Sequence, residues 1–291
     1  MSLFICTALA LLAFAGNSIF CRLALGGGLI DASGFTLIRL LSGAITLVLL
    51  WGAVHKVKNM KSNEMSIEMS INAFYSFGSW KGAFYLFVYA VAFSFAYLTL
   101  DTGTGALILF AAVQITMILI SVLRGGRLSN GEWLGVMLAF SGFVYLVYPT
   151  LTTPSLNGFL LMTVSGIAWG MYSLHGKASK RPLEDTLGNF VRTIPVLFLM
   201  LVVTFDMLSL TSEGVFLAIA SGVVASGLGY ALWYAVLPLL GAIAPAILQL
   251  LVPVLAALGG IIFVDESISL HLILSSLLII GGVLVVLKSK A

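Results

Sequence analysis

Few side chains in this sequence are placed to take part in catalysis. The HExxH, CxxC and GxSxG motifs are absent, and His55, His175 and His271 are far apart along the chain. No aspartate or glutamate lies deep inside an apolar segment, so paired carboxylates and metal-ligand sets are missing at depth. The sequence therefore argues against an enzyme. It predicts no catalytic residue, no metal site and no cofactor.

Two arginines lie inside apolar segments, Arg39 in FTLIRL and Arg192 in GNFVRT. Intramembrane cations are costly and usually face a cavity or a partner. One interpretation is that they attract an anionic group such as a carboxylate, or gate opposite mouths of one pathway. The other is that each lies one or two turns deep and snorkels to the surface, or pairs with carbonyls and a loop acid such as Asp31 or Glu184.

Three amides and several aromatic rings form a second group of candidates. Asn17, Gln114 and Gln249 are isolated in apolar surroundings, where burying an unpaired amide costs about 1–3 kcal/mol. Each either hydrogen-bonds between helices or, with the others, lines a cavity. Rings with polar tips suit a pocket for an organic solute, whereas rings near segment ends also suit the interfacial belt. The rings considered are Tyr97, Trp169, Tyr172, Tyr230, Trp233 and Tyr234.

These candidates lie in a chain built almost entirely of apolar blocks. Of its 291 residues, 60% are hydrophobic and 9% are charged, against about 25% charged residues in soluble domains. A membrane-spanning helix needs about 20 mostly apolar residues. We therefore predict an all-α integral membrane protein with ten transmembrane helices. The segments are 2–24, 32–54, 81–100, 103–123, 132–149, 155–176, 186–206, 213–237, 242–264 and 269–288.

The charges between these segments predict the orientation of the chain. An excess of lysine and arginine marks the cytoplasmic face, so both termini are expected in the cytoplasm and the protein in the plasma (inner) membrane. The basic side holds Lys56, Lys58, Lys61, Lys81, Arg124, Arg127, Lys177, Lys180, Arg181, Lys288 and Lys290. The other side holds Arg22, Asp31, Asp101, Asp206, Glu213, Asp265 and Glu266.

The two halves of the chain carry corresponding residues, and Arg39 matches Arg192. Because each half has an odd number of helices, we predict two inverted five-helix repeats, 1–150 and 151–291, as in many secondary transporters. Arg39 is then expected near the outer face and Arg192 near the inner face. The connection 55–80 breaks the symmetry and is expected to be either a short helix on the cytoplasmic surface or a partly disordered loop. Other matched positions are Gly16 and Gly170, Tyr97 and Tyr230, and Gly142 and Gly282.

The order and duplication of several motifs resemble the drug/metabolite transporter superfamily, of the EamA type with ten helices. The motifs are AFAGNSIF, FTLIRLLSGA, TGTGALILF, IAWGMYS, GLGYALWY and VPVLAALGGIIFVDESIS, and the resemblance covers essentially the whole chain. It implies alternating-access export or exchange of small organic solutes, often amino acids or related metabolites. It also implies a central cavity, with substrate-binding candidates Asn17, Tyr97, Gln114, Trp169, Tyr230 and Gln249.

The chain departs from this family pattern at one position. Many relatives place an acidic residue just before the proline of the ninth helix, where this chain has Val252, whereas Glu266 matches the acid that ends that helix. Proton coupling is therefore left open beside exchange or potential-driven export. The expected partners are a small-molecule substrate and the lipid bilayer, with no nucleic acid, and a homodimer is left open. The alternative function is a non-transporting or lipid-handling membrane component.

Overall fold

Helices form nearly all of the regular structure in the described part of the chain. The computed structural model describes residues 3–62, 76–123, 129–147, 154–177, 179–240, 248–249 and 251–289. The helices are α1 (Leu3–Gly26), α2 (Ala32–Ser62), α4 (Trp80–Ala96), α5 (Thr102–Leu123), α6 (Asn130–Val147), α7 (Leu156–Gly176), α8 (Pro182–Thr204), η1 (Phe205–Met207), α9 (Ser212–Ala220), η2 (Ser221–Leu228), α10 (Gly229–Val236), η3 (Leu237–Leu239), α12 (Leu251–Val264) and α13 (Leu270–Ser289).

Five of the described helical runs are long and apolar enough to cross a membrane: Leu3–Gly26, Ala32–Lys56, Thr102–Ile120, Pro182–Met207 and Ser212–Val236. Trp80–Ala96, Leu251–Val264 and Leu270–Val286 are shorter apolar helices. Large apolar side chains cover the outer surface, among them Phe4, Leu49 and Val203, as expected for a surface that faces lipid. The all-helical class and the multi-pass membrane character predicted from composition are confirmed.

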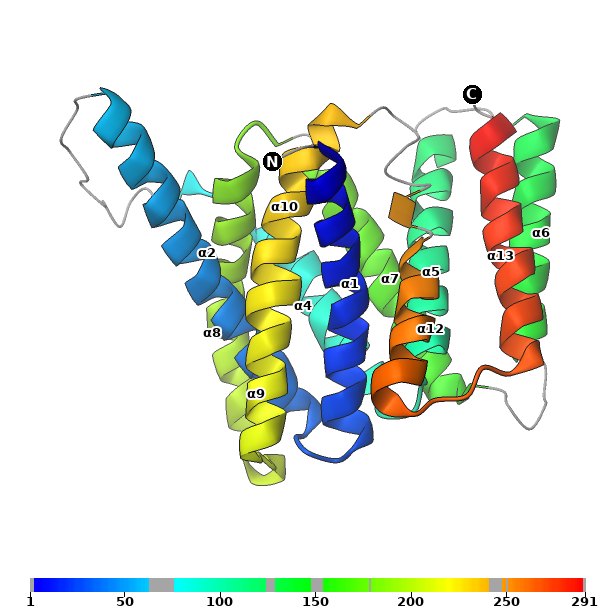
Figure 1. Cartoon of the computed structure of the whole chain (residues 1–291), viewed down its shortest axis with the longest axis horizontal. Helices are drawn as coiled ribbons and strands as arrows, with labels where there is room; N and C mark the ends of the chain where they lie inside the picture. The colour runs from blue at the N-terminus through cyan, green and yellow to red at the C-terminus, as the bar shows by residue number, and fades with distance from the viewer. Residues whose placement is uncertain are drawn as a thin grey trace.

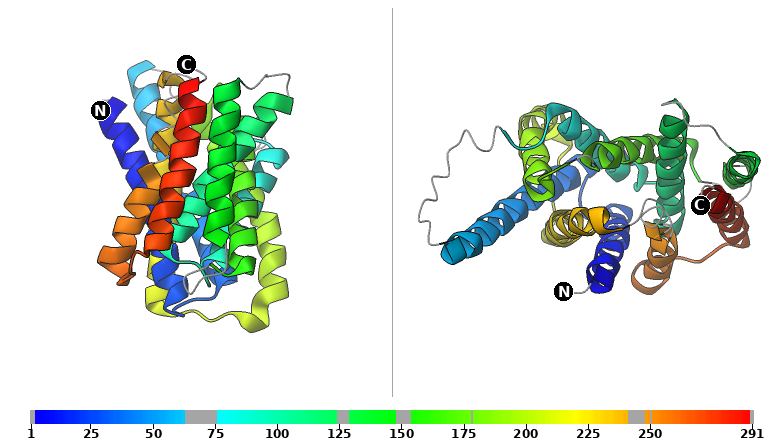
Figure 2. Two further views of the ribbon diagram at one scale, coloured as in Figure 1. Left: turned by 90° about the vertical axis from the view of Figure 1, so that its right-hand side faces the viewer. Right: turned by 90° about the horizontal axis from the view of Figure 1, so that it is seen from above.

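Most of the helices form one bundle, and α6 and α13 form a separate pair at one end of it (Figures 1 and 2). These two helices pack mainly against each other and only lightly against α5. Leu3 and Ser289 lie at the same end of the bundle, and the connection between α12 and α13 lies at the opposite end (Figure 1). Helix α2 extends to Ser62, beyond the predicted end at 54. Residues 63–75 of the predicted surface segment lie outside the described residues.

Hydroxyl side chains mark the starts of several helices, as the sequence requires. Ser79 accepts from the Gly82 amide at 2.9 Å and caps α4, and Ser155 caps α7 in the same way. Helix α8 instead begins with Pro182 and carries two acids in its first turn, which suits the positive end of its dipole. These caps fix where each helix enters the bundle.

The run from α9 to α10 is helical throughout but widens in the middle. Its central segment η2, SGVVASGL, is a π-helix, an uncommon form that occurs mostly as short bulges inside α-helices and is frequent at functional sites. Gly222 packs directly on α2: a Cβ at this position would overlap the Arg39 carbonyl and the Ser42 hydroxyl. The absence of a side chain at Gly222 therefore allows η2 to lie against α2 beside Arg39.

Candidate functional site

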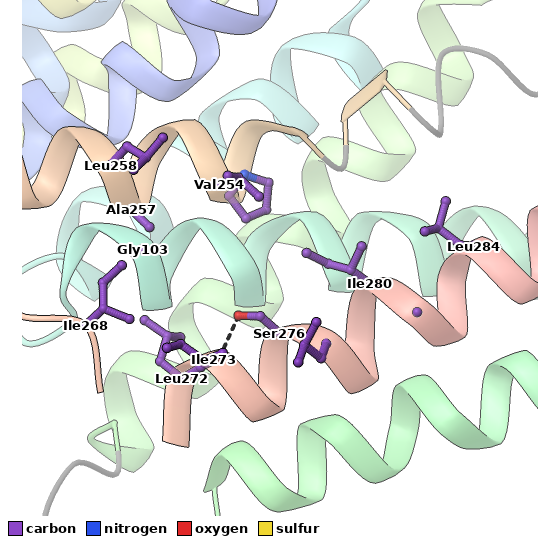
Figure 3. A pocket seen from close by; sticks show the side chains of 13 residues that line it. Gly103, Val254, Ala257, Leu258, Ile268, Leu272, Ile273, Ser276, Ile280 and Leu284 are labelled. Atoms are coloured by element: carbon purple, nitrogen blue, oxygen red, sulfur yellow. Dashed lines mark hydrogen bonds between the residues drawn. The ribbon is translucent and has the colours of Figure 1, made fainter. Parts of the chain in front are cut away.

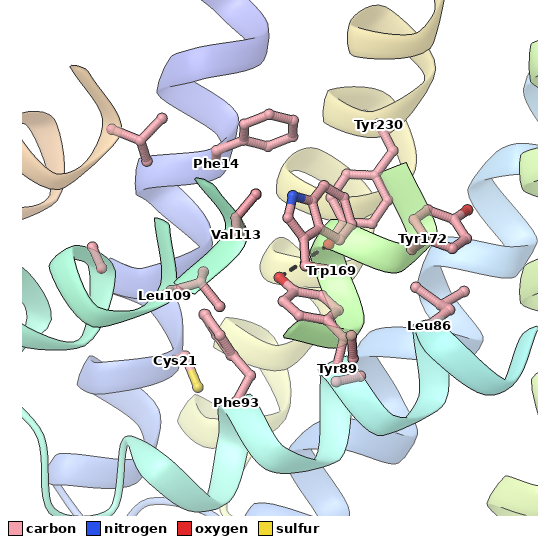
Figure 4. Close-up of a cluster of buried hydrophobic side chains, with 14 of the residues drawn as sticks. Phe14, Cys21, Leu86, Tyr89, Phe93, Leu109, Val113, Trp169, Tyr172 and Tyr230 are labelled. Atoms are coloured by element: carbon pink, nitrogen blue, oxygen red, sulfur yellow. Dashed lines mark hydrogen bonds between the residues drawn. The ribbon is translucent and has the colours of Figure 1, made fainter. Parts of the chain in front are cut away.

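A cluster of aromatic rings fills the centre of the bundle around Trp169 of α7 (Figure 4). The Trp169 ring centroid lies 4.7 Å from that of Tyr230, 4.9 Å from that of Tyr89 and 5.9 Å from that of Phe14. These four residues come from α1, α4, α7 and α10, and each is at least 95% buried. The site is thus assembled from helices in both halves of the chain.

Arg39 lies fully buried against this cluster. Its Nη2 donates to the hydroxyls of Tyr89, at 3.0 Å, and Tyr230, at 3.1 Å, and its Nε donates to Ser226 of η2 at 3.1 Å. The guanidinium carbon also lies 5.1 Å from the Tyr89 ring centroid and 5.0 Å from that of Phe93. Arg39 therefore neither snorkels nor pairs with Asp31, and it lies in the central network instead of at an outer mouth.

The charge of Arg39 has no carboxylate partner within the described residues, and its Nη1 has no hydrogen-bond acceptor there. Arginine stays protonated in proteins, and burying an uncompensated ion costs several kcal/mol. Hydroxyl dipoles and aromatic faces offset part of that cost. The buried Nε1–H of Trp169 also has no acceptor among the described residues. Two donors at one cluster are therefore available to a ligand.

Tyr89 shows the same excess of donors over acceptors. Its hydroxyl oxygen is within reach of three donors: Asn17 Nδ2 at 3.0 Å, Arg39 Nη2 at 3.0 Å and Tyr230 Oη at 3.2 Å. Asn17 in turn accepts from Ser221 of η2 at 2.6 Å. A phenolic oxygen can accept only about two hydrogen bonds, so an added acceptor would relieve the network. The site is therefore suited to an anionic or acceptor-rich group.

Little empty space remains at this cluster in the conformation described. A cavity of about 10 Å³ lies between α1, α4, α5, α7 and α10, which is room for about one water molecule. Its lining includes Asn17, Tyr89, Trp169 and Tyr230. Sites for organic ligands are usually clefts of about 300–1,000 Å³, so the helices around the cluster must separate before a metabolite fits.

A charged clamp joins helices at the end of the bundle opposite Leu3 and Ser289. Arg22 of α1 donates from Nε to Glu266 at 3.0 Å and from Nη2 to Asp101 at 3.4 Å. Glu266 also accepts from the backbone amide of Thr102, at 2.9 and 3.0 Å, at the start of α5. Asp265 adopts a left-handed backbone with φ 55°, a conformation that aspartate tolerates. The clamp ties α1, α5 and the end of α12 together.

The structure separates the predicted binding residues into two groups. Asn17, Trp169 and Tyr230 line the central cavity. The other three are buried and do not line it. Tyr97 donates to the Thr102 carbonyl at 3.2 Å, and Gln114 and Gln249 are 2% and 3% exposed.

Arg192 belongs to α8, and its side chain lies away from the aromatic cluster, next to the start of α4. Its Nη1 donates to the carbonyls of Gly188, at 3.2 Å, and Phe77, and its guanidinium carbon lies 6.0 Å from the Trp80 ring centroid. These contacts fit the interpretation in which the arginine pairs with carbonyls. Arg39 and Arg192 therefore occupy different environments.

Sequence reasoning missed Tyr89, Ser221 and Ser226. Tyr89 is one of two tyrosines in the run FYLFVYAVAF, and neither carries a distinctive signal among so many apolar residues. The spacing of Tyr89 gives a partial signal, because Tyr89, Phe93 and the C-cap residue Tyr97 recur every four residues along one face of α4. The two serines lie in a glycine-rich stretch that predicts close packing, and nothing there predicts their partners.

Comparison with known proteins agrees with a membrane transporter. Residues 156–288 match the EamA-like transporter family. An uncharacterized protein of Pseudomonas aeruginosa is 45% identical over 98% of this chain and 94% of its own length. A Salmonella typhimurium protein named "Probable amino-acid metabolite efflux pump" is 26% identical over 63% of this chain and 66% of its own length. A protein crystal structure aligns over 98% of this chain and 99% of that chain with a TM-score of 0.61 and 16% identity.

The apolar helices and these relatives define a multi-pass membrane transporter. An Archaeoglobus fulgidus protein named as an uncharacterized transporter is 26% identical over 72% of this chain and 76% of its own length. The chain belongs to the EamA-like transporter family, and the resemblance seen in its motifs is confirmed.

Proposed function

We propose that the protein is a secondary carrier for small organic metabolites that bear a carboxylate, amino acids among them. The observation that carries the proposal is the buried charge of Arg39, which has no carboxylate partner within the described residues and an Nη1 without an acceptor. A substrate carboxylate would take the place of the missing anion, because guanidinium and carboxylate form strong, often bidentate hydrogen bonds.

The surroundings of Arg39 favour a solute with an apolar or aromatic body. Phe14, Tyr89, Trp169 and Tyr230 bring ring faces and edges to the cavity, and rings pair well with apolar groups. The side chain of Asn17 and the indole N–H of Trp169 would bind polar groups of the solute. The name of the Salmonella relative supports amino-acid metabolites as one candidate class.

Alternating access is the mechanism that we propose for this carrier. Ten helices in two inverted five-helix repeats, 1–150 and 151–291, would rock around the Arg39 cluster. The clamp of Arg22 with Glu266 would close one mouth, while the cluster opens toward the other. The π-helix η2 is the candidate moving element, because it contacts both Asn17 and Arg39. We further propose that both termini face the cytoplasm and that the carrier acts in the plasma membrane as an exporter or exchanger.

Counterflow in proteoliposomes tests the proposal. Vesicles would be preloaded with amino acids, related carboxylates or the corresponding amines, and each would be measured with and without a proton gradient. We expect saturable exchange of carboxylates and none of the amines, with protein-free vesicles as the control. Exchange of amines alone, or no saturable exchange by folded protein, would contradict the proposal. A change on adding the gradient would establish proton coupling.

A further inference from the structure

A groove runs along the lipid-facing side of α12 and α13, where the α6–α13 pair stands apart from the bundle (Figure 3). It encloses about 430 Å³ and is lined almost wholly by apolar side chains. Its one lining serine, Ser276, already donates to the Leu272 carbonyl at 2.6 Å. Val254 and Leu277 on its walls are 48% and 65% exposed, so the groove opens to the bilayer.

The length of the groove matches one leaflet of a membrane. It follows α13 from Leu272 to Leu284, which is about 18 Å at the helical rise of ~1.5 Å per residue. Half of a hydrocarbon core of about 30 Å is ~15 Å. An acyl chain lying along α13 would therefore fill the groove from the membrane interface to the midplane.

A polar pocket continues the groove at the end of the bundle opposite Leu3 and Ser289. It encloses about 230 Å³, and Gly103, Ala257, Ile268 and Leu272 line both spaces. The groove and this pocket together thus have the form of a tail site joined to a headgroup site.

The chemistry of the pocket combines acceptors with donors. Asp101 and Glu266 line it, and Arg22 pairs with both from beside the pocket, so one negative charge is left over among the described residues. His271 lines it too and is 91% buried. Its Nε2 lies 3.1 Å from the Leu146 carbonyl, so Nε2 carries the proton and Nδ1 is an acceptor in the neutral ring. These groups suit an ammonium.

The donors in the same pocket suit a phosphate. Thr104 lines it, is 92% buried, and its hydroxyl has no hydrogen-bond partner among the described residues. Ser267 contributes a second hydroxyl, and α13 begins here, capped by Ser269 through the Leu272 amide at 3.1 Å. The first amides of a helix attract anions such as phosphate.

We propose that this composite site binds one phospholipid with an ethanolamine headgroup. Its ammonium would lie at Asp101 and Glu266, its phosphate at Thr104 and the start of α13, and one acyl chain in the apolar groove. Choline lacks the N–H donors that the carboxylates would accept from, and glycerol lacks the positive charge. This binding does not depend on what the carrier transports.

Lipid titration of the purified full-length protein tests the proposal, with binding followed by native mass spectrometry and the melting temperature. Phosphatidylethanolamine should bind about tenfold tighter than phosphatidylcholine or phosphatidylglycerol, as one charge-assisted hydrogen bond can provide. Equal binding of the three lipids would overturn the headgroup assignment. Water-soluble phosphoethanolamine should not compete at matched concentration, and full competition by it would show that the groove has no part.

Two pairs of variants locate the site. A Cβ at Gly281 meets no atom within 4 Å, so Gly281→Phe should fill the groove and abolish tight lipid binding without disturbing the fold. Gly52→Phe, at an equally open glycine outside the groove, should leave binding unchanged. Asp101→Asn should remove the preference for ethanolamine but keep lipid bound, whereas Asp206→Asn should change neither. Unaltered lipid binding by Gly281→Phe would overturn the proposal.

Discussion

Arg39 Nη2 lies 3.0 Å from the hydroxyl oxygen of Tyr89, and both side chains are at least 97% buried. The tyrosine hydroxyl is the point at which a buried cation, an amide and a second tyrosine meet. A neutral oxygen holds the arginine in place without cancelling its charge. The pair is therefore both a packing element and the basis for an anion-binding site.

Removing only the hydroxyl of Tyr89 should weaken solute binding. Tyr89→Phe keeps the ring against Trp169 but deletes the hydrogen bonds to Arg39 and Asn17. Misplacing the guanidinium should raise the KM for counterflow about tenfold, with folded protein still in the membrane. Tyr85→Phe on the same helix, at a half-buried ring, is the control. An unchanged KM in Tyr89→Phe would remove this hydroxyl from the site.

The indole N–H of Trp169 should contribute to solute affinity by donating a hydrogen bond to the bound solute. Trp169→Phe preserves an aromatic ring while it removes a buried donor that has no acceptor in the described residues. A net hydrogen bond of about 0.5–1.5 kcal/mol predicts a loss of solute affinity of about 2- to 10-fold. Competition in the counterflow assay measures this, with the exposed Trp133→Phe of α6 for comparison. Equal affinities in both variants would mean that the indole only packs.

The clamp should control access to the centre from the end opposite Leu3 and Ser289. Glu266→Gln weakens the ion pair with Arg22 and the cap on Thr102, so that mouth should open more often. Cys21 is fully buried next to Arg22 and so becomes accessible only when this mouth opens. Replacing the other cysteine, as Cys6→Ser, makes labelling specific to Cys21. A membrane-impermeant maleimide should label Cys21 several-fold faster in Glu266→Gln, and Glu213→Gln should leave the rate unchanged. Equal labelling in all forms would show that the clamp is no gate.

The contact between η2 and α2 should tolerate no added methyl group. Gly222→Ala would push against the Arg39 carbonyl, and overpacking of this kind costs about 1–3 kcal/mol. We expect a lower melting temperature together with weaker transport, because the same shift moves Ser226 away from Arg39. Gly52→Ala, at an open position, should match the wild type. A stable, fully active Gly222→Ala protein would contradict the close packing.

Most bounds of the described helices could be predicted from the sequence because apolar length and capping residues act locally, although α2 extends to Ser62. The Asn17, Trp169 and Tyr230 predictions came from residue type together with the family resemblance, and the structure brings these three to one cavity. The depth of Arg39 could not be predicted, because it depends on the approach of α4, α10 and η2 from distant parts of the chain. The π-helix could not be predicted either, because glycine and serine predict close packing without fixing the geometry of the helix.

The most direct test of the account compares a transported carboxylate with its own carboxamide as competitors of counterflow, in wild type and Arg39→Gln. Losing one partner of a buried charge pair costs at least about 2 kcal/mol, so the wild type should prefer the carboxylate by about 30-fold or more. Arg39→Gln should lose that preference, and Arg39→Lys should keep part of it. A folded Arg39→Gln protein with the wild-type preference would contradict the assignment of Arg39 as the carboxylate-binding residue.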